Sequence, residues 1–127
     1  MKRNTMLALV VVLGGLPALA HAQDCEEGAT TAAQVRNCLS GKDDALLDKA
    51  YAETLRRART QDATLAPKLS LAQASWLKFA QDSCEYTVAS STLQTNSNDA
   101  RLMCMQTFIQ ARIRVLNGYQ RALEQER

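Results

Sequence analysis

The chain has 127 residues, of which 15 are lysine or arginine, 13 are aspartate or glutamate and one is histidine. This length allows a single domain. Lys2 and Arg3 lie in a segment that we predict below to be a removed N-terminal leader. Without them, 13 basic residues face 13 acidic residues. A formally neutral domain lacks the broad basic surface that binds nucleic acid or an anionic membrane, and we expect neither as a partner.

The N-terminal segment has the three parts of a secretory signal peptide. A basic start is followed by a short apolar run over residues 6–16 and by a small-x-small sequence that ends at Ala22. We expect cleavage there, so that residues 1–22 are removed and residues 23–127 form the mature domain. An uncleaved anchor is the less favoured alternative, because a bilayer span needs about 20 apolar residues.

The residues around Cys25 bear on lipid attachment. A bacterial lipoprotein signal places small apolar residues directly before the modified cysteine, whereas Gln23 and Asp24 precede Cys25 here. We therefore expect no membrane anchor and a periplasmic or secreted protein.

Four cysteines lie in the mature part, namely Cys25, Cys38, Cys84 and Cys104. An even number of cysteines in a small exported domain predicts disulfides, and four cysteines allow three pairings. A zinc site is the alternative, but no Cys-x-x-Cys pair occurs and the only histidine, His21, leaves with the leader. We expect no metal site and no cofactor.

Helical periodicity dominates the mature chain and predicts up to four helices. The first begins at Thr30 or Thr31, either of which can cap it, and ends near residue 39, where Ser40-Gly41 offers a break or a kink. The second covers residues 43–61. A turn follows, and Pro67 takes an allowed first position in the next helix.

The third helix is predicted over residues 67–88, the polar stretch 90–98 as a loop, and the fourth helix from Ser97 or Asn98 to about residue 123, with a frayed end. The expected buried stripe of the third helix is Leu69, Ala72, Gln73, Trp76, Phe79, Ala80 and Ser83. That of the fourth is Ala100, Met103, Cys104, Thr107, Phe108, Ala111, Val115, Tyr119 and Leu123.

Amphipathic helices with short connections bury their stripes against one another, so we predict an all-α, small antiparallel bundle of three to four helices. Cys84 and Cys104 flank the polar loop and would lie at similar heights on facing helices. Cys25 and Cys38 flank the first helix. We therefore favour the pairs Cys25–Cys38 and Cys84–Cys104, which would staple the bundle with two disulfides.

The spacing of these residues resembles a known family. The matching motifs are Thr31-x-x-x-Val35-x-x-Cys38, Leu47-x-x-x-Tyr51-x-x-x-Leu55, Ala72-Gln73-x-x-Trp76-Leu77-x-Phe79 followed by Cys84, and Cys104-x-x-x-Phe108-x-x-x-Arg112. Together they resemble the LprI-type lysozyme-inhibitor domain. The resemblance implies a helical domain with two disulfides outside the cytoplasm, and inhibition of lysozyme.

We expect structural roles for the side chains of the motif, Tyr51, Gln73, Trp76 and Phe79. Trp76 lies on an apolar stripe, which favours the core over a binding anchor. Gln73 lies one turn earlier, and a glutamine on a buried stripe needs a hydrogen-bond partner, so we expect it to tie two helices together.

No catalytic constellation is visible. The mature chain has no histidine to act as a base, and Glu26-Glu27 and Asp43-Asp44 suit surface and helix-start charges. We therefore expect a binding protein and no enzyme. It would inhibit lysozyme-type muramidases by steric blockade; the alternative is an envelope scaffold or stress protein that binds another protein through a helix face.

The loop after the third helix is the candidate for binding a partner. Its polar side chains are Ser91, Thr92, Gln94, Asn96 and Asn98. A disulfide at its base would hold the loop, and a held loop loses less entropy on binding. The alternative is a plain solvent-exposed connection.

Overall fold

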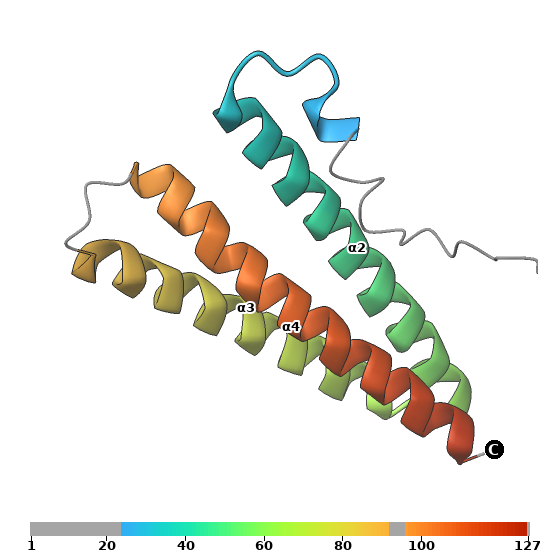
Figure 1. Cartoon of the computed structure of the whole chain (residues 1–127). Helices are drawn as coiled ribbons and strands as arrows, with labels where there is room; N and C mark the ends of the chain where they lie inside the picture. The colour runs from blue at the N-terminus through green and yellow to red at the C-terminus, as the bar shows by residue number, and fades with distance from the viewer. Residues whose placement is uncertain (1–23, 92–95, 127) are drawn as a thin grey trace, which may run out of the picture.

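The computed structural model describes residues 24–91 and 96–126, so the expected signal peptide lies outside the described part of the chain. A helical turn at residues 24–26 precedes three long helices: α2 (Ala32–Gln61), α3 (Leu65–Ser90) and α4 (Ser97–Gln125) (Figure 1). The described residues contain no strand. The all-α prediction is therefore confirmed.

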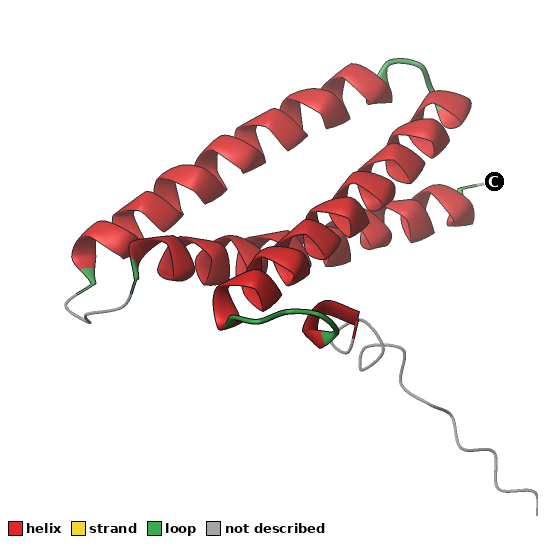
Figure 2. Cartoon of the chain, turned by 90° about the horizontal axis from the view of Figure 1, so that it is seen from above, coloured by secondary structure: helices red, strands yellow, loops and turns green. Residues whose placement is uncertain are grey.

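The three helices run up, down and up. Short connections make α3 antiparallel to both neighbours, so α2 and α4 run in the same direction, as the contacts Arg36–Asp99 near their starts and Thr54–Leu116 further along require. α2 and α3 are joined at one end and diverge toward the other (Figures 1 and 2). α4 packs against both of them and holds the bundle together.

The break expected at Ser40-Gly41 is wrong, because α2 runs without interruption from Ala32 to Gln61. A helical glycine costs only about 1 kcal/mol relative to alanine, which a long packed helix tolerates. The helix is also well started: the amide of Gln34 donates to Thr31 Oγ1 over 3.2 Å, and the amide of Thr31 donates to Gln34 Oε1 over 3.2 Å. This reciprocal capping box supplies partners for amides that the first turn leaves unbonded.

The two glycines on either side of this cap make a matched test. We expect Gly41→Ala to stabilise the fold by about 0.5–1 kcal/mol, because Gly41 is helical and a methyl group there meets nothing within 4 Å. Gly28→Ala is expected to destabilise it by about 1 kcal/mol, because Gly28 has φ +81°, in the left-handed region. Urea denaturation measures the unfolding free energy of both variants. A change of the same sign in both would contradict the contrast between a helical Gly41 and a left-handed Gly28.

Two other helix starts differ from the predictions. α3 begins at Leu65, so Pro67 takes the third position, where the amide of a first turn also lacks a helical partner. α4 is capped by neither Ser97 nor Asn98: the cap is Asn96, whose Oδ1 accepts from the Asn98 amide over 2.9 Å.

The core lies along α4 and contains Leu47, Ile109 and Leu116, with Ile113 and Trp76 packed against it. The stripe predicted for α4 is therefore wrong in part, because Met103, Val115 and Tyr119 are exposed. α4 carries apolar residues on two faces, and periodicity alone does not say which face meets both neighbours.

Two disulfides staple the bundle, in the pairing that the sequence favours. Cys25–Cys38 closes the N-terminal turn onto α2, and Cys84–Cys104 joins α3 to α4; the Cα atoms are 5.6 Å apart in each pair. Both bonds lie at the same end of the molecule, which we call the disulfide end.

Candidate functional site

The disulfide end is held by contacts among all three helices. Cys84 is fully buried, and beside it the Arg101 guanidinium forms two hydrogen bonds to the Glu85 carboxylate, with Nε 2.5 Å from Oε1. These bonds lower the pKa of Glu85. On the other side of α4, Arg36 Nη2 lies 2.6 Å from Asp99 Oδ2. The end of the bundle that carries the α3–α4 connection is thus fixed in place.

The connection itself is shorter than the predicted 90–98 loop, because α3 continues to Ser90 and α4 begins at Ser97. Of the proposed binding residues, Thr92 and Gln94 lie outside the described part of the chain. Ser91, Asn96 and Asn98 are exposed, but Asn98 belongs to the first turn of α4 and Asn96 caps it.

Three motif side chains link the helices. Tyr51 donates its hydroxyl to Ser70 Oγ over 3.0 Å, which joins α2 to α3. Gln73 Oε1 accepts from Arg112 Nε over 2.9 Å, which joins α3 to α4 in the way expected of this glutamine. Trp76 is half-buried against the core, and the Arg112 guanidinium carbon lies 5.7 Å from its ring centroid.

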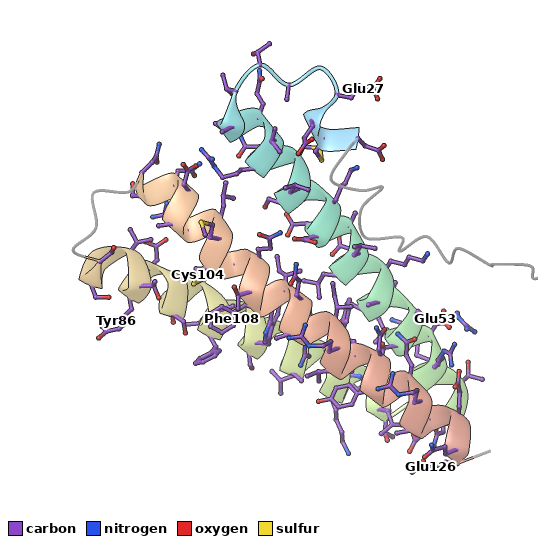
Figure 3. The ribbon with its side chains drawn as sticks, in the orientation of Figure 1. Glu27, Glu53, Tyr86, Cys104, Phe108 and Glu126 are labelled. Atoms are coloured by element: carbon purple, nitrogen blue, oxygen red, sulfur yellow. A yellow bond between two sulfur atoms is a disulfide. The ribbon has the colours of Figure 1, made fainter. Side chains whose placement is uncertain are left out.

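Phe79 departs from the predicted buried stripe, because it is 61% exposed. Its ring meets Phe108 of α4 edge-on, with centroids 5.6 Å apart and an interplanar angle of 86°. The two rings form an aromatic pair on the outer surface of α3 and α4. Figure 3 shows Phe108 and Cys104 on α4, in the half of the molecule that bears the disulfides.

Sequence reasoning missed the burial of Arg112, which is only 7% exposed. Its Nη2 has no hydrogen-bond partner among the described residues, and no ion pair is formed there with a described carboxylate. Charged residues are seldom fully buried without a pairing partner, so nothing in the sequence indicates this burial. The only clue to a special role was the place of Arg112 in the Cys104-x-x-x-Phe108-x-x-x-Arg112 motif.

Charge is unevenly distributed along the bundle, although acidic and basic residues are equal in number over residues 23–127. When each helix is divided at its middle, the half with the disulfides carries Asp24, Glu26, Glu27, Asp43, Asp44, Asp82, Glu85 and Asp99 against Arg36, Lys42, Lys78 and Arg101. The other half carries Lys49, Arg56, Arg57, Arg59, Lys68, Arg112, Arg114 and Arg121 against Asp48, Glu53, Asp62, Glu124 and Glu126. The disulfide end is therefore negative and the opposite end positive.

The pKa values of two carboxyl groups, one in each half, are shifted in opposite directions. Partial burial, with the nearby Asp48 and Asp43, raises the pKa of Asp44 at the negative end. At the positive end, hydrogen bonds from Arg56 and then Arg57 lower the pKa of Glu53 to about 2. Arg57 also pairs with Glu124 of α4, so this network ties α2 to α4.

Glu53 should make stability depend on pH. Its folded-state pKa lies below the ordinary 4.5, so its ionised form stabilises the fold above pH 4.5 and that contribution is lost as the pH falls toward 2. We expect the thermal midpoint to fall less steeply between pH 4.5 and 2 in Glu53→Gln than in the unaltered protein. Parallel curves for the two proteins would contradict the assignment.

The described residues hold no group of three or more metal-ligating side chains, and none of their helices is long and apolar enough to cross a membrane. Comparison with curated proteins finds no match, and comparison with solved structures finds none either. The family model for lysozyme inhibitor LprI matches residues 23–116, a segment that contains all four cysteines and the three long helices up to Leu116. The chain therefore belongs to the LprI lysozyme inhibitor family.

Proposed function

We propose that this protein is an exported inhibitor of lysozyme-type muramidases, which acts by steric blockade and catalyses no reaction. The match to the LprI family over residues 23–116 carries this proposal. Two disulfides suit a protein that works in the periplasm or outside the cell, because such bonds persist in oxidising compartments. The signal peptide expected at residues 1–22 would deliver it there.

Blockade needs a surface that is held in place rather than a reactive group. A muramidase cuts its substrate in a cleft that holds two carboxyl groups, one acting as acid and the other as nucleophile or base. The disulfide end presents the α3–α4 connection on a base fixed by Cys84–Cys104 and by Glu85–Arg101. Ser91, Thr92, Gln94, Asn96 and Asn98 are the polar residues proposed to enter or cover the cleft.

Purified residues 23–127 with intact disulfides should slow the lysis of bacterial walls by a lysozyme in a dose-dependent way. The matched control is the same protein after reduction and alkylation, which should lose the effect. Undiminished lysis at micromolar protein would contradict the proposal. Mass spectrometry of the naturally exported protein tests the processing, with an N-terminus at Gln23 and no lipid as the expected result.

A second candidate is an envelope scaffold or stress protein that binds another protein through a helix face. The observation in its favour is the exposure of Leu71, Phe79 and Tyr86 along α3. Capture of one envelope protein other than a muramidase, by the natural chain and not by a Phe79→Gln variant, would favour this function over inhibition.

A further inference from the structure

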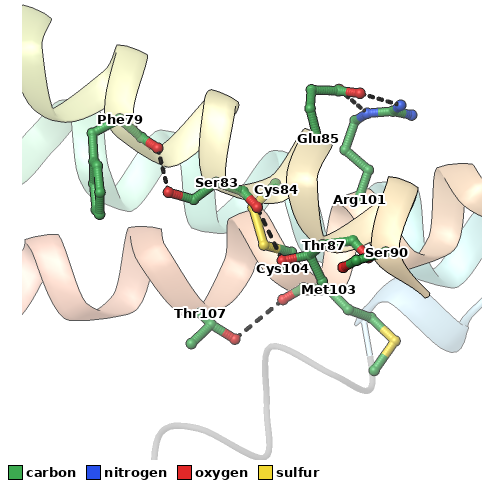
Figure 4. The surroundings of a disulfide bond; sticks show 10 residues. All are labelled: Phe79, Ser83, Cys84, Glu85, Thr87, Ser90, Arg101, Met103, Cys104 and Thr107. Carbon is green, nitrogen blue, oxygen red and sulfur yellow. Dashed lines mark hydrogen bonds and ion pairs between the residues drawn. A yellow bond between two sulfur atoms is a disulfide. The ribbon is translucent and has the colours of Figure 1, made fainter.

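The surface between α3 and α4 at the disulfide end is less polar than its sequence suggests. Ser83 Oγ donates to the Phe79 carbonyl over 2.7 Å, Thr87 Oγ1 to the Ser83 carbonyl over 2.9 Å, and Thr107 Oγ1 to the Met103 carbonyl over 3.2 Å (Figure 4). Each of these hydroxyl groups therefore donates its hydrogen bond to a carbonyl group of its own helix. When the hydroxyl group of a threonine is bonded in this way, its methyl group remains available to contact a partner.

Thr87, Met103 and Thr107 line a hollow of about 480 Å³ between the two helices, together with Asp99, Cys104 and Phe108 among others. We call it the α3–α4 hollow. Met103 is 63% exposed, and Phe79, packed edge-on against Phe108, is 61% exposed. The hollow therefore offers an open, mainly apolar surface of the kind that marks protein interaction sites.

The charges around the hollow restrict what can occupy it. Asp99 is paired with Arg36, and Glu85 with Arg101, so the charges nearest the hollow largely cancel. Further out, the exposed carboxylates Glu26, Glu27 and Asp44 make the whole end negative. A cationic partner is attracted by this field, whereas a second copy presenting the same end, or an anionic membrane, is repelled.

We infer that the α3–α4 hollow, within the negative disulfide end, is the surface that docks a cationic muramidase and takes in an apolar side chain of that enzyme. This inference rests on the proposed function and adds the contact surface to it. The carboxylates steer the enzyme toward this end, and the hollow anchors it.

The anchor is tested by Met103→Gln and Phe79→Gln, with Leu71→Gln as the matched control. Leu71 is an equally exposed apolar residue of α3, at 69%, but lies toward the positive end. We expect each of the first two changes to raise the inhibition constant against a basic lysozyme about tenfold, since each removes an apolar contact of side-chain size. Leu71→Gln should leave it unchanged.

Steering is tested separately with Glu26→Gln/Glu27→Gln, whose matched control is Glu126→Gln at the positive end. We expect the first to lower the association rate about threefold at 0.01 M salt and to have no effect at 1 M, where charges are screened beyond about 3 Å. The control should not slow association. Unfolding midpoints and intact-disulfide masses of all variants show whether each one is folded.

The outcomes separate the inference from the function on which it rests. Inhibition by the unaltered protein that survives Met103→Gln and Phe79→Gln in folded form would overturn the docking surface and leave the inhibitor. A self-associated protein that Met103→Gln makes monomeric, with inhibition unchanged, would assign the hollow to a second copy and also overturn it. No inhibition by the unaltered protein would overturn both.

Discussion

Replacing Cys84 and Cys104 together by alanine is expected to lower the free energy of unfolding by about 3 kcal/mol, the chain-entropy value for a loop of this size. The two cysteines are 20 residues apart, and the bond joins α3 to α4 where α2 has diverged from α3. Domains of this kind have only about 5–15 kcal/mol in total. The loss should therefore be visible as a lower urea midpoint.

The matched control is Cys25→Ala/Cys38→Ala, which opens a loop of 13 residues and has a similar entropic cost. Its effect should stay local, because that bond fastens only the N-terminal turn to α2. Hydrogen exchange should speed up at the end of α3 and the start of α4 in the first variant, and at residues 24–38 in the second. Equal exchange in the two variants would contradict the division of labour between the disulfides.

Much of the helical fold and of the disulfide pairing can be predicted from short stretches of the sequence. Local features predict the helices and the favoured disulfide pairing. These features are the even number of cysteines, the polar stretch between Cys84 and Cys104, and the capping residue Thr31. Gly41 misleads because a glycine in a long helix has a small cost that distant packing against α4 outweighs.

The candidate site was harder to predict because it depends on how faces are shared between helices. Phe79 and Met103 lie on predicted apolar stripes, yet both are exposed. The core uses the face of α4 that contains Ile109 and Leu116, and Leu69 and Trp76 are the α3 side chains packed against it. The hollow also depends on hydroxyl groups such as that of Thr107 bonding within their own helix. Sequence identifies the hydroxyl but not its partner.

The largest effect of a single substitution is expected at Gln73. In the folded protein Gln73 Oε1 accepts from Arg112 Nε, and Nη2 of that arginine already lacks a partner among the described residues. Gln73→Leu leaves the buried guanidinium without this bond, and a hydrogen bond to a charged group contributes about 1.5–3 kcal/mol. We therefore expect Gln73→Leu to lower the unfolding free energy by about 2–3 kcal/mol.

Arg112→Met should do far less harm, and this asymmetry identifies the cause. Methionine fills a similar space against Trp76 and carries no charge to desolvate, so replacing the buried cation is expected to change stability by less than about 1 kcal/mol or to raise it. In Gln73→Leu/Arg112→Met both polar partners are gone, and most of the loss caused by Gln73→Leu should be recovered. Urea denaturation of the four proteins gives the coupling energy directly. Additive losses would mean that Gln73 stabilises the helices through packing alone, and that the stacking of Arg112 on Trp76 satisfies the cation without it.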